Sequence, residues 1–269
     1  MFFLHVKLFL KETIMYHKII YLSIFLIATS SPVIAQSTSL PLLSNGKTEF
    51  AMTTQGGFSE SYANGDRIRI YGAFVRFGIG FHKMFDVYSL IGSSKQNIRH
   101  SDTSLSNFDS GMARTLGGGL AIQWPFKLPW KLKLSSTGQM VVFSPTGAAY
   151  SRSTVPNTNY RKRHDFTYEW RHTQVATFAA RQFRHYEFFI GGELIINSVD
   201  FKRDLTLESD EGTFFLSSSR GVYLEESRPN LSLGLNIALP GRHHLGFELK
   251  GGTDSDVAIF IAIGQTGKP

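Results

Sequence analysis

The chain has no cysteine among its 269 residues. Disulfide bonds and thiolate chemistry are therefore excluded, and zinc could be held only by histidine and carboxylate ligands. The GxSxG motif of many serine hydrolases is also missing. Arginine-rich helical segments and the aromatic motifs of RNA-binding domains are missing as well. Nucleic acid is therefore not expected as a partner.

The sequence also has no apolar run long enough to span a membrane as a helix, which needs roughly 20 residues. The longest such run is Ile19–Ala28, which follows a short basic segment starting at Met15 and precedes Val33-Ile34-Ala35. This order predicts a secretory signal peptide over residues 1–35, cleaved before Gln36. If translation starts at Met15, the basic segment, the apolar run and the cleavage pattern follow in the order typical of a signal peptide. The alternative to a cleaved signal peptide is an uncleaved membrane anchor.

Helical periodicity is nearly absent beyond the polar tether expected at residues 36–46, and alternation with a period of two replaces it. In Asn230–Leu239, leucine or isoleucine occupies every second position, and small or polar residues occupy the others. Trp130–Val142, Phe166–Arg181 and Tyr186–Asn197 alternate in the same way. Successive strand side chains point to opposite faces, so each segment predicts a strand with one apolar and one polar face.

Glycine decides which face is inside. Gly72, Gly78 and Gly80 share a face with Arg76. Small residues beside a charge suit a crowded interior better than a solvent-exposed face. This favours a membrane barrel with its apolar face outward over a soluble sandwich or lipocalin-like barrel. In Phe166–Arg181 the same rule places Phe166, Tyr168, Trp170, Ala176 and Phe178 on the lipid face, where His172 is a misfit that suggests a bulge.

Connection lengths support the barrel. We expect strands near residues 47–59, 67–81, 86–99, 112–124, 130–144, 164–181, 186–201, 221–239, 244–253 and 256–264. Every second connection is then a turn of four or five residues, starting at residues 82, 125, 182 and 240. Several of the others are longer than ten residues, as in barrels with short periplasmic turns and long outer loops. Aromatic residues flank the short turns, where a membrane interface would hold them.

The fold class is therefore all-β, a transmembrane antiparallel up-and-down β-barrel over residues 47–264 with a tail at 265–269. Ten strands are expected, and eight or twelve stay open. Residues 212–226 are predicted either to extend a hairpin beyond the membrane or to add a strand pair. Over this range the chain resembles the small Gram-negative outer-membrane barrels, the class that includes opacity-type and OmpA-like membrane domains. That resemblance implies outer-membrane location and outer-membrane assembly machinery as a partner, although the usual terminal aromatic residue is missing. A monomer is favoured.

Charged residues on the polar faces are predicted to line the lumen: Arg76, Lys131, Lys133, Glu169, Arg171, Glu187, Glu193, Glu248 and Lys250. If they pair, the lumen is plugged and the protein is structural or presents surface loops. If they face water, the barrel is a narrow passive channel. A basic loop carries Arg152, Arg161, Lys162 and Arg163. Two interpretations stay open: a contact with lipopolysaccharide phosphates, or a solvated run of charges, which the sequence favours.

An outer-membrane hydrolase, acting on peptide or lipid at the outer rim, is the alternative function. The chain is similar to omptin-like proteases in strand number, and His164, Asp165, Asp102 and Asp109 are the nearest candidate residues. His164 and Asp165 are neighbours in a strand, so they point to opposite faces. No catalytic residue is assigned, and no cofactor is expected. The adjacent His243 and His244 fall in a short turn with no further ligands, so no metal site is predicted.

Overall fold

The computed structural model describes residues 50–82, 84–126, 128–152, 161–209, 212–252 and 257–267. The predicted signal peptide and tether lie outside these ranges. The strands are β1 (Phe50–Ala63), β2 (Asp66–His82), β3 (Phe85–Arg99), β4 (Phe108–Ser110), β5 (Ala113–Trp124), β6 (Lys133–Phe143), β7 (Thr146–Arg152), β8 (Arg161–Phe183), β9 (Tyr186–Ser209), β10 (Gly212–Leu239), β11 (His243–Gly252) and β12 (Val257–Gly267). Two short 3₁₀ helices, η1 (Pro129–Lys131) and η2 (Pro240–Arg242), lie between strands.

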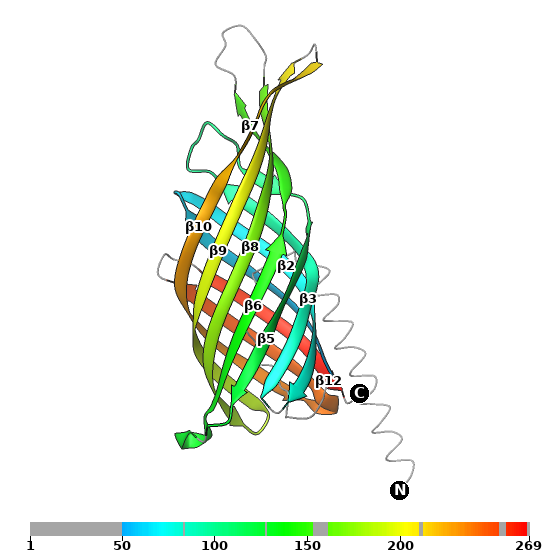
Figure 1. Cartoon of the computed structure of the whole chain (residues 1–269), viewed down its shortest axis with the longest axis vertical. Helices are drawn as coiled ribbons and strands as arrows, with labels where there is room; N and C mark the ends of the chain where they lie inside the picture. The colour runs from blue at the N-terminus through cyan, green and yellow to red at the C-terminus, as the bar shows by residue number, and fades with distance from the viewer. Residues whose placement is uncertain are drawn as a thin grey trace, which may run out of the picture.

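Ten of the strands close into a ring, in the order β1, β2, β3, β5, β6, β8, β9, β10, β11, β12 and back to β1 (Figure 1). All pairings around the ring are antiparallel, and β12 pairs with β1 from Glu60↔Val257 to Phe50↔Gly267. Closure leaves no open sheet edge within the ring. The predicted ten-stranded up-and-down barrel is confirmed.

The two remaining strands lengthen the wall at one end. β4 pairs with β3 and β7, and β7 pairs with β8, so these short strands continue β5 and β6 beyond Gly111–Met112 and Ser144–Pro145. Proline has no backbone N–H to donate, which explains the interruption at Pro145. The carbonyl oxygen of Pro145 still accepts a 3.0 Å hydrogen bond from the backbone N–H of Tyr168.

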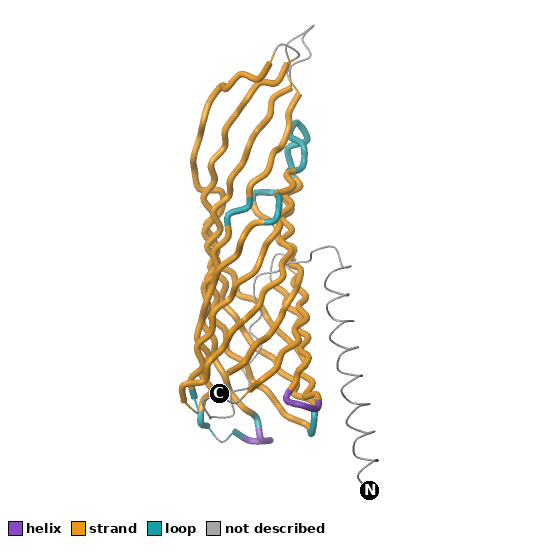
Figure 2. The backbone as a smooth tube through the Cα atoms, turned by 90° about the vertical axis from the view of Figure 1, so that its right-hand side faces the viewer, coloured by secondary structure: helices purple, strands orange, loops and turns teal. Residues whose placement is uncertain are grey.

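Residues 212–226 form the outer part of β10 and pair with β9, with register shifts at Phe215/Ser217 and Val222/Leu224. Of the two predicted arrangements, the extended hairpin is therefore the one observed. Together with β7 and β8, it forms an extension that stands beyond the rest of the barrel, seen at the top of Figures 1 and 2. We call this end the outer end.

The opposite end carries the four connections that the sequence predicts to be short, and here β3, β6, β9 and β11 begin. The connection between β5 and β6 is longer than predicted, because β6 begins only at Lys133. Left-handed residues shape these tight turns, including Trp130, Arg184 and Arg242. At the outer end, Asn64 (φ 52°) and Gly65 (φ 82°) join β1 to β2. Two consecutive positive φ values are what a two-residue hairpin requires, and an Asn-Gly sequence adopts them readily.

The outer wall is apolar over most of the ring. Leu231 is 70% exposed, Ile190 61% and Leu116 55%, while Ser232 and Arg76 on the inner face are 1% and 2% exposed. The alternation predicted for Asn230–Leu239 and Tyr186–Asn197 is therefore correct. We call the outward apolar side chains of the ring the apolar belt. Neither helix of the described part of the chain is long or apolar enough to cross a membrane.

The phase predicted for β8 is wrong. Phe166, Tyr168, Trp170, Ala176 and Phe178 are buried inside the barrel instead of facing lipid. The pairings of β8 with β6 and β9 run without a register shift, so there is no bulge at His172. The histidine was a misfit because the whole strand had been assigned to the opposite phase.

Inward glycines make room for these aromatic rings. A Cβ atom on Gly191 would lie 2.3 Å from the ring of Phe178, and one on Gly234 would lie 2.2 Å from the ring of Phe189. Phe178 and Phe189 themselves meet edge to face, with centroids 5.7 Å apart. The bare backbone at these two positions is therefore needed for close packing across the lumen.

Candidate functional site

A buried ion pair lies inside the ring. Lys250 Nζ is 2.8 Å from Glu193 Oε2 and 3.7 Å from Glu248 Oε1. The hydroxyl of Ser232 donates a 2.6 Å hydrogen bond to Glu248 Oε1. Buried charges are tolerated when they are paired and hydrogen-bonded in this way, and the arrangement fills space that a channel would leave to water.

Hydrogen bonds extend this pair around the inner wall of the barrel. Tyr88 donates to Gln139 (3.0 Å), Gln139 donates to Gln174 (2.6 Å), and Gln174 donates to Glu193. The guanidinium carbon of Arg76 lies 3.5 Å from the centroid of the Tyr88 ring. Side chains from β2, β3, β6, β8, β9, β10 and β11 thus form one polar network on the inner face of the barrel.

Nearer the short turns, Glu187 accepts a 3.3 Å hydrogen bond from Asn236 and lies 3.5 Å from Lys133 Nζ. The structure contradicts three other residues of the predicted lumen-facing set. Lys131 lies in η1 and is exposed, and Glu169 and Arg171 face outward from β8. Arg171 pairs with Asp200 on the outer surface at 3.0 Å. The inverted phase of β8 accounts for two of these errors, and the late start of β6 accounts for Lys131.

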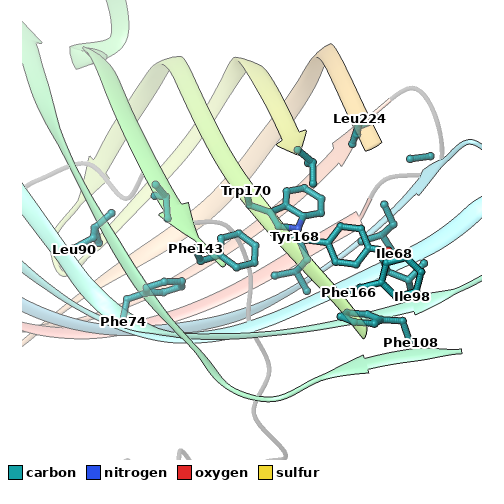
Figure 3. Close-up of a cluster of buried hydrophobic side chains, with 14 of the residues drawn as sticks. Ile68, Phe74, Leu90, Ile98, Phe108, Phe143, Phe166, Tyr168, Trp170 and Leu224 are labelled. Carbon is teal, nitrogen blue, oxygen red and sulfur yellow. The ribbon is translucent and has the colours of Figure 1, made fainter. Parts of the chain in front are cut away.

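An aromatic layer fills the lumen above the polar network. The rings of Phe143 and Trp170 stack with centroids 5.5 Å apart, and Phe108 meets Tyr168 edge to face at 5.1 Å (Figure 3). The indole N–H of Trp170 donates a 3.0 Å hydrogen bond to Gln96 Oε1. These rings belong to one buried apolar cluster that also includes Ile68, Leu90 and Val199, so strands from several sides of the ring contribute to it,.

At the outer end, one carboxylate ties three segments together. Asp66 accepts hydrogen bonds from the backbone N–H of Ser101 (2.8 Å) and from the hydroxyl of Tyr223 (3.0 Å), and lies 3.0 Å from His100 Nδ1. Burial alone would favour the protonated carboxyl, but these hydrogen bonds outweigh it and hold the pKa of Asp66 below its ordinary value,. Burial and the neighbouring Asp66 carboxylate raise the pKa of the Tyr223 phenol.

Ser151 and His164 form a serine–histidine pair in the extension. Ser151 Oγ lies 2.9 Å from His164 Nε2. Burial, and then the positive charges of Arg203 and Lys162, lower the pKa of His164. His164 Nδ1 has no hydrogen-bond partner among the residues that the structure describes. A catalytic triad needs an acid there to orient the imidazole, and Asp165 instead pairs with Arg163 at 2.9 Å,.

His172 is the buried polar residue that sequence reasoning assigned to the wrong environment. It is fully buried, and its Nδ1 lies 2.8 Å from Asn197 Oδ1. It also lines a cavity of about 40 Å³ together with Ser59, Ser61 and Asn230. Its position between Trp170 and Gln174 was the available signal, because a histidine among lipid-facing residues is costly.

The predicted lipopolysaccharide contacts lie far from the apolar belt. Arg161, Lys162 and Arg163 begin β8 in the extension, and the side chain of Arg152 is outside the described set. Arg161 lies over the Tyr150 ring at 3.6 Å, and Arg163 is engaged with Asp165 and Glu208.

The adjacent histidines begin β11. His244 Nε2 lies 3.4 Å from Thr53 Oγ1. Across the described ranges of the chain, no three histidine, aspartate or glutamate side chains are grouped so as to hold a metal ion.

Neither a family model nor a curated protein matches the sequence. Among solved structures, the chain is similar to the translocator domain of the autotransporter NalP from Neisseria meningitidis, at 10% identity and a TM-score of 0.46, covering 85% of this chain and 91% of that one. It is also similar to the transport unit of the autotransporter AIDA-I from Escherichia coli, at 9% identity and a TM-score of 0.44, covering 93% of this chain and 97% of that one. A third similar structure is the outer membrane protease OmpT from Escherichia coli, with 8% sequence identity and a TM-score of 0.45. The match covers 86% of this chain and 99% of that one.

Proposed function

We propose that this protein is an outer-membrane β-barrel with a closed lumen, which anchors and presents its outer extension instead of conducting solutes. One observation carries the proposal: the wall is inverted relative to a soluble barrel. Leucine and isoleucine cover its outside, whereas the Lys250–Glu193 pair is inside. A soluble protein would not expose a continuous apolar surface of this kind. In a bilayer, only closed barrels and helices satisfy their backbone hydrogen bonds.

The buried aromatic layer and the polar network inside the barrel support the structural, loop-presenting role over the narrow channel. Any solute would have to cross both the Phe143–Trp170 layer and the hydrogen-bonded network around Gln174. The hydrolase alternative has less support, because the Ser151–His164 pair lacks an acid among the described residues.

Fractionation and conductance test this proposal. We expect the protein in the outer-membrane fraction, with a mobility on gels that shifts when the folded barrel is boiled. The purified protein in a planar bilayer should give no steady ion conductance. Recovery as a soluble periplasmic protein without the shift would refute the membrane location, and steady conductance would refute the closed lumen.

We further propose that lipid phosphates, including those of lipopolysaccharide, are contacted at the outer edge of the apolar belt. Lys95 lies four residues beyond the belt residue Ile91 on β3, roughly 13 Å along the strand at about 3.3 Å per residue,. Arg114 on β5 and Arg171 on β8 also lie just beyond exposed belt residues. Arg163 is twelve residues beyond Val175, roughly 40 Å along its strand,. The three belt-edge cations are therefore better placed for headgroups than the basic residues that begin β8.

Two triple variants separate these sites. The triple variant Lys95→Gln, Arg114→Gln and Arg171→Gln should reduce the lipopolysaccharide retained through mild purification by about tenfold, because it removes three positive charges from the edge of the belt. Two of these cations, Lys95 and Arg171, also pair with the surface carboxylates of Asp109 and Asp200. The control replaces Arg161, Lys162 and Arg163 by glutamine and should retain wild-type amounts. The reverse result would place the contact on the extension.

A further inference from the structure

The ring wall is lowest at the β11–β12 hairpin. β10 pairs with β11 only as far as Asn230↔Gly252, and β1 pairs with β12 only as far as Glu60↔Val257. Both β10 and β1 continue beyond these pairs toward the outer end. Within the described residues, no strand fills the space between them there, so the wall has a notch beside the outer edge of the apolar belt.

Side chains bridge the notch instead of a backbone ladder. Arg228 Nη2 donates a 2.7 Å hydrogen bond to the carbonyl oxygen of Tyr62, and Asn64 Nδ2 donates a 3.0 Å hydrogen bond to the carbonyl oxygen of Tyr223. These side-chain hydrogen bonds can break while the strands stay paired. This makes the notch the most easily opened part of the ring wall.

The cavity of about 40 Å³ lies directly behind this notch. Its lining comes from β1, β8, β9, β10, β11 and β12, and includes Ser59, Ser61, His172, Asn197, Asn230 and Lys250. A cavity needs roughly 10 to 15 Å³ on this measure to hold one water molecule, so there is room for a few polar atoms of a ligand.

The hydrogen bonds fix which nitrogen of His172 carries its proton. Asn197 Nδ2 donates to the carboxylate of Glu226 at 3.1 Å, so Asn197 Oδ1 must face His172 Nδ1 and accept from it. With Nδ1 protonated, Nε2 of the neutral ring is a hydrogen-bond acceptor. That atom is buried and has no hydrogen-bond partner among the described residues.

A second acceptor lines the same cavity. Asn230 Oδ1 is also buried without a hydrogen-bond partner in the described chain. The two cations at the cavity already have carboxylate partners, Lys250 with Glu193 and Arg228 with Glu226. A ligand that brings donors is therefore favoured, and an additional anion is not.

We propose that this cavity binds adjacent hydroxyl groups of a sugar, presented by an outer-leaflet glycolipid that enters through the notch. The ligand hydroxyls donate to His172 Nε2 and Asn230 Oδ1, and the serine hydroxyls accept or donate beside them. The lipid source rests on the proposed membrane location. The hydroxyl site itself rests on the two buried acceptors.

The test uses the full mature barrel, labelled with ¹⁵N-histidine, in alkyl phosphocholine micelles, with octyl β-glucoside and methyl β-glucoside as probes. The His172 signal is assigned by its loss in His172→Gln. We expect its Nε2 resonance to shift saturably with octyl β-glucoside, at a concentration at least tenfold below that needed for methyl β-glucoside. Equal responses to both would support the hydroxyl site and assign it to soluble sugars.

Asn230→Leu removes one acceptor at similar volume, and Ser59→Leu fills the cavity. Each should raise the half-saturating concentration at least tenfold while the boiling-dependent gel shift is retained. Gly192→Ala on the outer face is the matched control and should respond as wild type. No saturable shift in the wild-type protein, or unchanged binding in both cavity variants, would overturn the proposal. Membrane location is tested separately by fractionation.

Discussion

Lys250 Nζ and Glu193 Oε2 lie 2.8 Å apart inside the barrel, on side chains that are 3% and 0% exposed. β11 and β9 are not neighbours in the ring, so this contact joins two strands across β10. Each charge is stabilised by the other and by the hydrogen bonds around it, and neither would be tolerated alone.

Lys250→Met should therefore destabilise the barrel by about 3 to 5 kcal/mol, because it leaves buried carboxylates without their cation. Urea unfolding in micelles, followed by the boiling-dependent gel shift, measures the change. Lys202→Met provides the matched control, since Lys202 pairs with Asp204 at 2.6 Å but is 43% exposed. Exposed pairs contribute at most about 1 kcal/mol. Equal effects of the two substitutions would contradict the role of burial.

Gly191→Ala should cost about 1 to 3 kcal/mol, because its Cβ atom would overlap the ring of Phe178 and the backbone oxygen of Thr177,. Gly192→Ala changes the adjacent residue in the same way, but its Cβ atom meets nothing within 4 Å. Unfolding of the two variants in parallel tests the packing argument. A larger loss in Gly192→Ala would mean that the inner and outer faces of β9 are exchanged.

Trp170→Ala should cost about 3 to 5 kcal/mol through the cavity it leaves in the aromatic layer. It should still give no ion conductance if, as proposed, the network around Gln174 closes the lumen independently. Trp130→Ala is the control, since Trp130 is 76% exposed and its loss leaves no cavity. Conductance in Trp170→Ala would show that the aromatic layer alone closes the barrel.

Asp66 should make the outer end sensitive to acid. Its pKa is lowered in the folded protein, so its contribution to stability is present above its ordinary value of 3.8 and is lost as pH falls through the lowered folded value,. Asp66→Asn should therefore expose the outer hairpins to protease at neutral pH. The difference between wild type and variant should shrink below about pH 4. A difference that stays constant down to pH 2 would exclude titration of Asp66 as the cause.

The architecture was predictable because the apolar belt imposes a simple rule. For most strands in the belt, alternation gives the outer face directly, as with Leu231 and Ile190, and the short turns give the strand count. The rule fails for β8 because its larger apolar residues face inward along the whole strand. At the level of the belt, Phe178 is buried while Thr177 is exposed, and farther out the outer face carries Glu169 and Arg171.

The candidate site was harder to predict than the fold. Glu193, Glu248 and Lys250 follow from strand alternation, but their partners depend on the register between strands distant in sequence. His172 was visible only as an anomaly. The cavity behind the notch depends on where β11 stops relative to β10, which alternation does not encode.

The pairing of β1 with β12 joins the two ends of the described chain through eleven residue pairs, beginning at Phe50↔Gly267, and this affects how the barrel can assemble. Contacts so distant in sequence form slowly, because a long loop must close before they contribute. We therefore expect the nascent barrel to stay an open sheet with two reactive edges until the last strand has been made. Removing β12 should convert the protein from a closed barrel into edge-to-edge aggregates, detectable by light scattering during refolding.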